Sequence, residues 1–300
     1  MNRNLLHTGI LLLLVAVLLL TKPYWSGSSL EYGIAVAGIL IAGIPHGAMD
    51  HLTASFLKGT KFRLFKYLIQ YTLSALLYLA VWFLFPGVAL LLFLLLTAWH
   101  FGETDLVCFT NKKKSPIIIF GYGFCLLMWL LLKDADTTLQ WIQLVAGKQE
   151  YVDSIITALS SVPHLLWFVL SAVMIFITVI NDQTKWLPAF MFLCFLFVSV
   201  YTSLILGFII YFTGWHSLQA LQHIRLSVFK HSGLVNLVLN ALPATLGSVV
   251  LLFLIVTYGK EEWVQSSSLP SLFILLSVLT LPHMAEMHRL YTVKGSDFFK

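Results

Sequence analysis

Apolar residues run along this chain in long, uninterrupted stretches rather than in alternation with polar ones. A transmembrane helix needs about 20 mostly apolar residues, whereas a membrane-spanning strand alternates apolar and polar positions. The pattern therefore predicts an all-α, polytopic membrane helix bundle. The ten predicted transmembrane helices span residues 5–21, 30–47, 66–85, 87–104, 115–133, 163–181, 186–201, 203–222, 236–258 and 269–290.

Three regions between or within these helices need separate interpretation. Residues 186–222 form an apolar run that is too long for one span, so we expect a tight turn near Tyr201 to divide it. Residues 134–162 are amphipathic, and we expect them to form interfacial helices on the membrane surface.

The first apolar segment is not followed by a small-residue cleavage site, which favours a retained helix over a signal peptide. No stretch is polar enough for a soluble domain, so residues 1–300 are predicted to form a single integral membrane domain.

Composition supports the membrane assignment and excludes several function classes. The chain is 59% hydrophobic and only 10% charged, whereas soluble domains average about 25% charged residues. Its three cysteines are scattered, which predicts neither a disulfide framework nor a zinc knuckle. There is no glycine-rich phosphate loop, and the net charge of +5 is modest, so no nucleic acid partner is expected.

The basic residues indicate how the helices are oriented, because lysine and arginine concentrate in cytoplasmic loops. With ten helices and a cytoplasmic amino terminus, 14 of the 18 basic residues fall on the cytoplasmic side. The other four are Lys22, Lys133, Lys148 and Lys260. We therefore predict that both termini are cytoplasmic.

Histidines gather at the ends of four predicted helices, beginning with the stretch "GIPHGAMDHL" at positions 43–52. The second, fourth, eighth and tenth helices all run in the same direction, so these ends are expected to lie at one depth in the membrane. The histidines at these ends are His46, His51, His100, His216, His223, His283 and His288. The remaining His7, His164 and His231 are expected to be interfacial polar residues.

Polar side chains inside a membrane are costly and usually functional. Imidazole is a good ligand for zinc, copper, iron and nickel, and ligands drawn from several helices can form a compact site. The four helix ends therefore indicate a shared metal site or a proton-handling site, with interfacial hydrogen bonding as the alternative for any single histidine. His216 and His223 are two turns apart, about 10 Å, so one metal ion cannot bind both on an unbroken helix.

Carboxylates lie close in sequence to two of these histidines. Asp50 follows His46 by four residues, and Glu103 follows His100 by three, with Asp105 nearby. Such carboxylates can accept the hydrogen bond of a ligand imidazole and fix its orientation, and solvation at the membrane surface is the alternative.

Proline and glycine residues lie beside the same histidines. Pro45 and Pro282 each precede a histidine directly, and a proline there can bend the helix so that the imidazole ring turns inward. Gly47 and Gly102 permit helices to approach closely.

The motifs narrow the chemistry to one type of metal centre. The chain lacks the dense HxxxH and HxxHH boxes of membrane di-iron enzymes and the HExxH motif of intramembrane zinc proteases. Three or four neutral histidines with open coordination positions favour a single ferrous ion that can bind dioxygen. The motifs "GIPHGAMDH", "HFGETD", "YFTGWHS" and "TLPHM" resemble the Brp/Blh family of bacterial and archaeal membrane β-carotene dioxygenases, from the second helix to the tenth.

This resemblance implies an Fe²⁺ enzyme that adds O₂ across the central 15,15′ double bond of β-carotene and releases two all-trans-retinal molecules. It also implies a multi-pass protein of a bacterial or archaeal inner membrane, with a retinal-binding rhodopsin as the user of the product. By the same resemblance, His46, His100 and His216 match iron ligands. The position of the family's next ligand is occupied by Ala220 here, so the fourth ligand is expected to be His223, with His283 as its rival.

A carotenoid substrate needs an apolar tunnel, for which the aromatic and apolar residues beside the histidines are candidates, with ordinary packing as the alternative. They are Trp99, Phe101, Tyr211, Phe212, Trp215 and Met284. A metal near the inner face requires a tilted or flat path for a substrate that is about as long as the membrane is thick. Two other functions stay open: an oxygenase for another carotenoid or lipid, and a non-catalytic carotenoid- or retinal-binding protein or proton-coupled transporter.

Overall fold

The computed structural model describes residues 3–25, 28–109, 114–180, 185–229, 234–258 and 269–294, and within these ranges every regular element is a helix. Long apolar runs explain this, because a backbone in lipid must satisfy its own hydrogen bonds. The elements are α1 (Arg3–Trp25), α2 (Ser29–Gly38), η1 (Ile39–Gly43), α3 (Ile44–Ala48), α4 (Asp50–Lys58), η2 (Gly59–Lys61), α5 (Leu64–Leu84), α6 (Pro86–Phe109), α7 (Pro116–Leu131), η3 (Leu132–Asp134), α8 (Ala135–Ala146), α9 (Glu150–Ser160), α10 (His164–Val179), α11 (Trp186–Ser199), α12 (Leu204–Ile209), η5 (Ile210–Ser217), α13 (Leu218–Val228), α14 (Leu234–Tyr258) and α15 (Leu269–Lys294).

Each of the ten predicted segments contains a helix, but the count of ten membrane spans is not confirmed. Among the described residues, seven helices are long and apolar enough to cross a membrane. An eighth span results only if α9 and α10, which meet at a 76° bend, are taken together. The apolar helices Trp186–Ser199 and Leu239–Ile255 are shorter than a full span. The chain is therefore a multi-span membrane protein, and the cytoplasmic placement of its termini stays a prediction.

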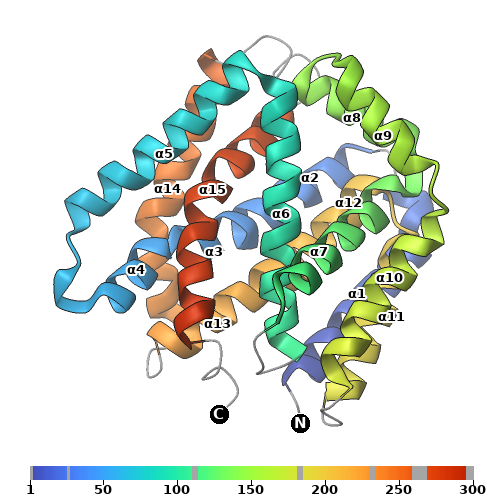
Figure 1. Cartoon of the computed structure of the whole chain (residues 1–300), viewed down its shortest axis with the longest axis horizontal. Coiled ribbons are helices and arrows are strands. Elements are labelled where there is room, and N and C mark those ends of the chain that lie inside the picture. The colour runs from blue at the N-terminus through green and yellow to red at the C-terminus, as the bar shows by residue number, and fades with distance from the viewer. Residues whose placement is uncertain are drawn as a thin grey trace.

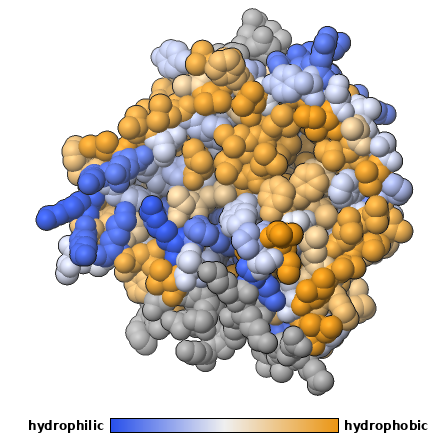
Figure 2. Space-filling model, viewed as in Figure 1, coloured by the Kyte–Doolittle hydropathy of each residue, from blue (hydrophilic) through white to orange (hydrophobic). Residues whose placement is uncertain are grey.

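The helices form a bundle in which α6 and α15 lie side by side near the centre (Figure 1). The contact of α1 with α11 and that of α7 with α10 build one flank, while α5 packs against α15 and α14 packs against α3. Figure 2 shows a largely hydrophobic face, with hydrophilic side chains gathered where Figure 1 places the turn between α4 and α5. Exposed basic residues occupy this turn: Lys58, Lys61, Arg63 and Lys66.

The predicted interfacial region, 134–162, is helical but is more closely joined to the bundle than we expected. Helix α8 continues the apolar stretch of α7 in one run, Pro116–Ala146. It packs against α6 and α15 and buries Thr138, Ile142 and Val145. Helix α9 buries only Val152 and Ile156. Thus α8 is part of the bundle wall, and a surface position remains a prediction for α9.

Close contact between α6 and α7 depends on two glycines. A Cβ atom at Gly102 would lie 1.9 Å from the Ile119 carbonyl oxygen, and one at Gly123 would lie 1.8 Å from the Ala98 carbonyl oxygen. Both distances are far below van der Waals contact, so the prediction for Gly102 is confirmed. At Gly47, by contrast, an added Cβ would meet His283 Nδ1 at an ordinary 3.6 Å.

Candidate metal centre

Four elements bring one buried imidazole each to a common point in the bundle. His46 lies on α3, His100 on α6, His216 on η5 and His283 on α15, and none is more than 5% exposed. One ligand nitrogen from each of His46, His100 and His216 lies within 4.8 Å of the others. Three distant segments of the chain thus form a site whose size suits a single metal ion.

His283 completes a ring of four side chains around this point. Its ring centroid lies 4.7 Å from that of His46 and 4.9 Å from that of His100. On the opposite side, the centroid of His216 lies 5.7 Å from that of His46 and 4.8 Å from that of His100. The interplanar angles are 77–89°, so the rings meet edge to face rather than in stacks.

Most ring nitrogens of this cluster lack hydrogen-bond partners among the described residues. Both ring nitrogens of His100 and His216, Nδ1 of His46 and Nε2 of His283 are buried and unsatisfied. Leaving buried polar atoms unpaired is costly, and native proteins rarely do so without a reason. A metal ion held by neutral imidazoles would satisfy one nitrogen each of His46, His100 and His216, so these residues fit such an ion.

Two π-helical segments position the histidines that come from the second and eighth predicted helices. Segment η1 ends at Gly43, directly before the short helix α3 that carries His46, and η5 contains His216 itself. The two segments are in contact, and a Cβ at Gly43 would lie only 2.8 Å from Phe212. Single-turn π-helices occur frequently at functional sites, because the extra residue re-aims a side chain.

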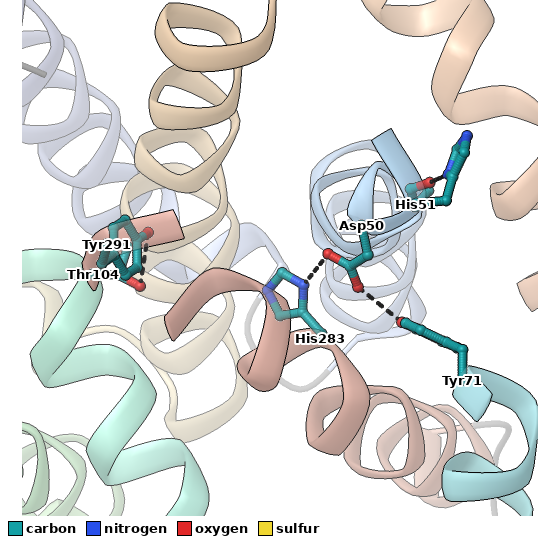
Figure 3. Close-up of polar contacts among 7 residues, drawn as sticks. Asp50, His51, Tyr71, Thr104, His283 and Tyr291 are labelled. Carbon is teal, nitrogen blue, oxygen red and sulfur yellow. Dashed lines mark hydrogen bonds and ion pairs between the residues drawn. The ribbon is translucent and has the colours of Figure 1, made fainter. Parts of the chain in front are cut away.

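Asp50 orients His283 rather than His46. The Nδ1 atom of His283 lies 2.8 Å from Asp50 Oδ1, and the Tyr71 hydroxyl donates to Asp50 Oδ2 at 2.9 Å (Figure 3). The predicted pairing with His46 is wrong because the helix does not continue: α3 ends at Ala48, and α4 starts at Asp50 after a turn at Met49. With Nδ1 bonded to the carboxylate, the Nε2 atom of His283 is left for a metal ion.

The other two predicted carboxylate partners do not bond to the clustered histidines. Glu103 Oε1 lies 2.6 Å from Nδ1 of His288, whose side chain is half exposed. Asp105 accepts hydrogen bonds from Tyr122, Tyr211 and Trp215, at 2.9, 2.6 and 3.1 Å. These two carboxylates were predicted from sequence spacing alone, which does not show what other helices place beside them.

His223, the expected fourth ligand, lies beside other partners. Its Nε2 atom is 3.8 Å from the Cys108 thiol, and its Nδ1 atom is 3.3 Å from the Tyr291 hydroxyl. Tyr291 in turn donates to Thr104 (Figure 3). The spacing of two helical turns from His216 separates the two rings, as the spacing alone indicated. The geometry therefore favours the rival, His283.

The remaining histidines lie outside the cluster. His51 points away from Asp50 and places its Nδ1 atom 3.1 Å from the Ala48 carbonyl (Figure 3). His7 and His164 bond to the carbonyls of Gly214 and Trp129 at 2.8 and 2.7 Å. His231 lies outside the described residues.

A cavity of about 410 Å³ adjoins the four histidines and reaches the outer surface along α5 and α14. Its lining includes exposed residues of these helices: Leu68, Thr72, Leu76 and Gly247.

Of the six predicted tunnel residues, Phe101 and Phe212 line this cavity. Tyr211 and Trp215 are instead fully buried and bonded to Asp105, while Trp99 packs near His288 at a centroid distance of 6.3 Å. Met284 is partly buried and is not among the lining residues that the structure describes.

Sequence reasoning missed Tyr71, which lies on α5 and binds the carboxylate of Asp50. Tyr71 is one of three tyrosines on α5, and nothing in the sequence distinguishes it from Tyr67 or Tyr78. Nor does the sequence indicate that α5 lies against α4 at this point.

Comparisons with known proteins identify the family of this chain. A family model described as Beta-carotene 15,15'-dioxygenase matches residues 37–291, a span that includes all four clustered histidines. The chain is 26% identical to the "Beta-carotene 15,15'-dioxygenase" of uncultured marine bacterium 66A03, over 261 residues that cover 83% of this chain and 90% of the relative. No solved structure matches the chain significantly. The match to the family model covers most of the chain, which therefore belongs to the Brp/Blh-like β-carotene 15,15′-dioxygenase family.

Proposed function

We propose that this protein cleaves β-carotene at its central 15,15′ double bond with O₂ and releases two molecules of all-trans-retinal. The observation that carries the proposal is the ring of four buried imidazoles, each with at least one unsatisfied nitrogen, beside a cavity that reaches the outer surface of the bundle. The family membership and the name of the bacterial relative support the choice of reaction.

The metal is proposed to be Fe²⁺, held by His46, His100, His216 and His283. A ferrous ion held by these residues would supply the activation of dioxygen for its addition to the double bond. His283 is preferred to His223 because it contacts the rings of both His46 and His100. The reaction balances without a further reductant: the carbon–carbon double bond and the O–O bond break, and two carbonyl groups form.

The chain's own contribution to the metal site is orientation. Asp50 holds Nδ1 of His283, and Tyr71 holds the other carboxylate oxygen. This arrangement fixes the imidazole tautomer with the proton on Nδ1, so that the lone pair of Nε2 faces the cluster. Asp105 does not contact the four histidines directly. It binds the Tyr211 and Trp215 side chains and so holds the π-helical segment that carries His216.

The substrate is proposed to enter laterally from the bilayer. β-Carotene dissolves in the hydrocarbon core, and the exposed lining residues on α5 and α14 place the cavity mouth where lipid would contact the bundle. Phe101 and Phe212 contact the ring of His216, with centroid distances of 4.5 and 5.9 Å. They are therefore placed to hold the polyene against the cluster and to exclude water from it.

The predicted membrane placement belongs to the same proposal. With cytoplasmic termini in a bacterial or archaeal inner membrane, the cluster would lie in the cytoplasmic half of the bilayer, and the polyene would follow a tilted path. Retinal released into the bilayer would be available to a retinal-binding rhodopsin in the same membrane.

A reconstituted assay tests the reaction. Purified protein in lipid nanodiscs is loaded with Fe²⁺ and supplied with β-carotene under ¹⁸O₂, and products are identified by mass spectrometry. We expect two retinal molecules for each β-carotene consumed, with label in both aldehydes when solvent exchange is minimised. A protein with full metal loading that makes no retinal would contradict the proposal. If it cleaves another carotenoid instead, the oxygenase alternative is favoured; if it binds no stoichiometric iron, the transporter or binding-protein alternative is favoured.

A further inference from the structure

A second cavity lies beside the first, between α6, α7, α8, α12 and α15. Its volume is about 150 Å³, and its wall is almost entirely hydrocarbon. The hydroxyl of Thr138, a polar group of this wall, already donates to the Leu131 carbonyl. None of the described lining residues is exposed, in contrast to those at the mouth of the larger cavity. We call this second cavity the apolar chamber.

The apolar chamber and the larger cavity share part of their walls. The residues that line both are Phe93, Thr97, Phe208, Phe273 and Leu276. Phe93 and Phe273 meet edge to face at 4.9 Å, and Phe208 stacks on Phe212 at 5.9 Å. Phe212 also stacks against His216, so the stacked pair Phe208 and Phe212 extends from the chamber wall to the cluster.

The size and polarity of the apolar chamber suit one kind of occupant. Apolar cavities of about 150 Å³ lined by Leu, Ile and Phe stay dry and bind a six-membered hydrocarbon ring. β-Carotene carries such a ring at each end of its polyene. When its central bond lies at the cluster, its two halves must extend in different directions, and the larger cavity accommodates the half that remains on the lipid side.

We propose that the apolar chamber seats one terminal ring of the carotenoid and thereby places the central double bond at the histidine cluster. The polyene passes between Phe93, Phe208 and Phe273, of which Phe208 and Phe273 are only partly buried. The wall formed by α8 then limits how deeply the carotenoid enters the apolar chamber. This proposal rests on the proposed function, since it assigns the binding site of one half of that substrate.

Filling the chamber tests the assignment. Val145 on α8 is 4% exposed and lines the chamber, whereas Val173 on α10 is 47% exposed and lines neither cavity. We expect Val145→Phe to lower retinal formation from β-carotene at least ten-fold and to weaken carotenoid binding to the same degree. The matched control Val173→Phe should behave as the unmodified protein. Binding is measured from the visible absorbance band of the carotenoid, which does not require turnover.

A truncated substrate separates loss of ring binding from general damage. β-Apo-8′-carotenal carries a ring at one end only. Its shortened, ringless end can point toward the apolar chamber and is too short to reach α8. Val145→Phe should cleave it within about two-fold of the unmodified protein, giving one retinal and a shorter dialdehyde. Ile205→Phe, on the opposite wall at α12, provides a second chamber-filling variant and should give the same pattern.

The outcomes also distinguish this proposal from the proposed function. If the unmodified protein makes no retinal, the proposed function fails, and the binding measurement still tests the chamber. If both filled variants bind and cleave β-carotene within two-fold of the unmodified protein, the chamber does not hold a ring. Equal losses with β-carotene and the apocarotenal, at unchanged iron content, would also overturn the assignment.

Discussion

His283 Nδ1 lies 2.8 Å from Asp50 Oδ1, although the two residues are 233 positions apart in the chain. The contact joins the last described helix to the first histidine motif. It also leaves Nε2 of His283 buried without a partner among the described residues, beside the rings of His46 and His100. A carboxylate, a histidine and the candidate metal centre therefore lie next to one another in the bundle.

Removal of the Asp50 carboxylate should weaken metal binding. In the variant Asp50→Ala, Nδ1 of His283 and the Tyr71 hydroxyl lose their acceptor, and the imidazole is no longer fixed. Loss of such a partner typically lowers metal affinity by about 10- to 100-fold, which chelator competition would measure. Tyr71→Phe is the matched control, since it leaves the bond between Asp50 and His283 in place and should have a smaller effect. Unchanged affinity in Asp50→Ala would show that this contact does not support the metal site.

The two candidates for the fourth ligand can be separated by substitution. His283→Ala should lower iron stoichiometry or affinity strongly, because it removes one of four contacting rings. His223→Ala should retain iron, because the ring of His223 lies beside Cys108 and Tyr291. Elemental analysis of the purified variants measures this. The opposite result, with iron lost only from His223→Ala, would reverse the assignment.

Metal binding should stabilise the folded protein. A ligand at a hundred times its Kd stabilises the native state by about 2.7 kcal/mol if it does not bind the unfolded chain. Addition of Fe²⁺ under anaerobic conditions should therefore raise the Tm of the unmodified protein in detergent. His100→Ala, which loses a ring at the centre of the cluster, should show little or no increase. An equal increase in both proteins would indicate binding elsewhere.

The packing of α6 against α7 should be sensitive to a single methyl group. Gly102→Ala would place a Cβ atom 1.9 Å from the Ile119 carbonyl oxygen, which forces the two helices apart. Overpacking of this kind costs about 1–3 kcal/mol or more. Gly33→Ala is the matched control, because an added Cβ there has no neighbour within 4 Å. The Tm of Gly102→Ala should fall well below that of Gly33→Ala, and equal values would contradict the close contact.

The helices and the meeting of the histidines could be predicted from the sequence because each depends on a local pattern. Runs of about 20 apolar residues indicate spans, and histidines at the ends of helices that run in one direction indicate a common depth. His46, His100 and His216 do meet in the structure. The number of spans could not be fixed in this way, because α11 is short and α9 bends sharply into α10.

The partners of the carboxylates could not be predicted because they depend on breaks in the helices and on contacts between distant segments. Spacing placed Asp50 on the same face as His46, but the turn at Met49 separates them. The contact of Tyr71 with Asp50 depends on how α5 packs. The two cavities likewise depend on the packing of α5, α8 and α14, which no local sequence pattern predicts. The choice of His283 over His223 likewise required the positions of all four rings.

The π-helical segment η5 makes the site sensitive to chain length as well as to residue identity. Each residue of an α-helix turns the chain by about 100°, since a turn contains 3.6 residues. Deletion of one residue between Ile210 and Trp215 would restore regular α-helical hydrogen bonding, yet it would rotate the His216 ring away from the other three. The extra residue of the π-helical segment therefore makes the backbone less regular, and it also keeps the His216 ring directed toward the other three imidazoles.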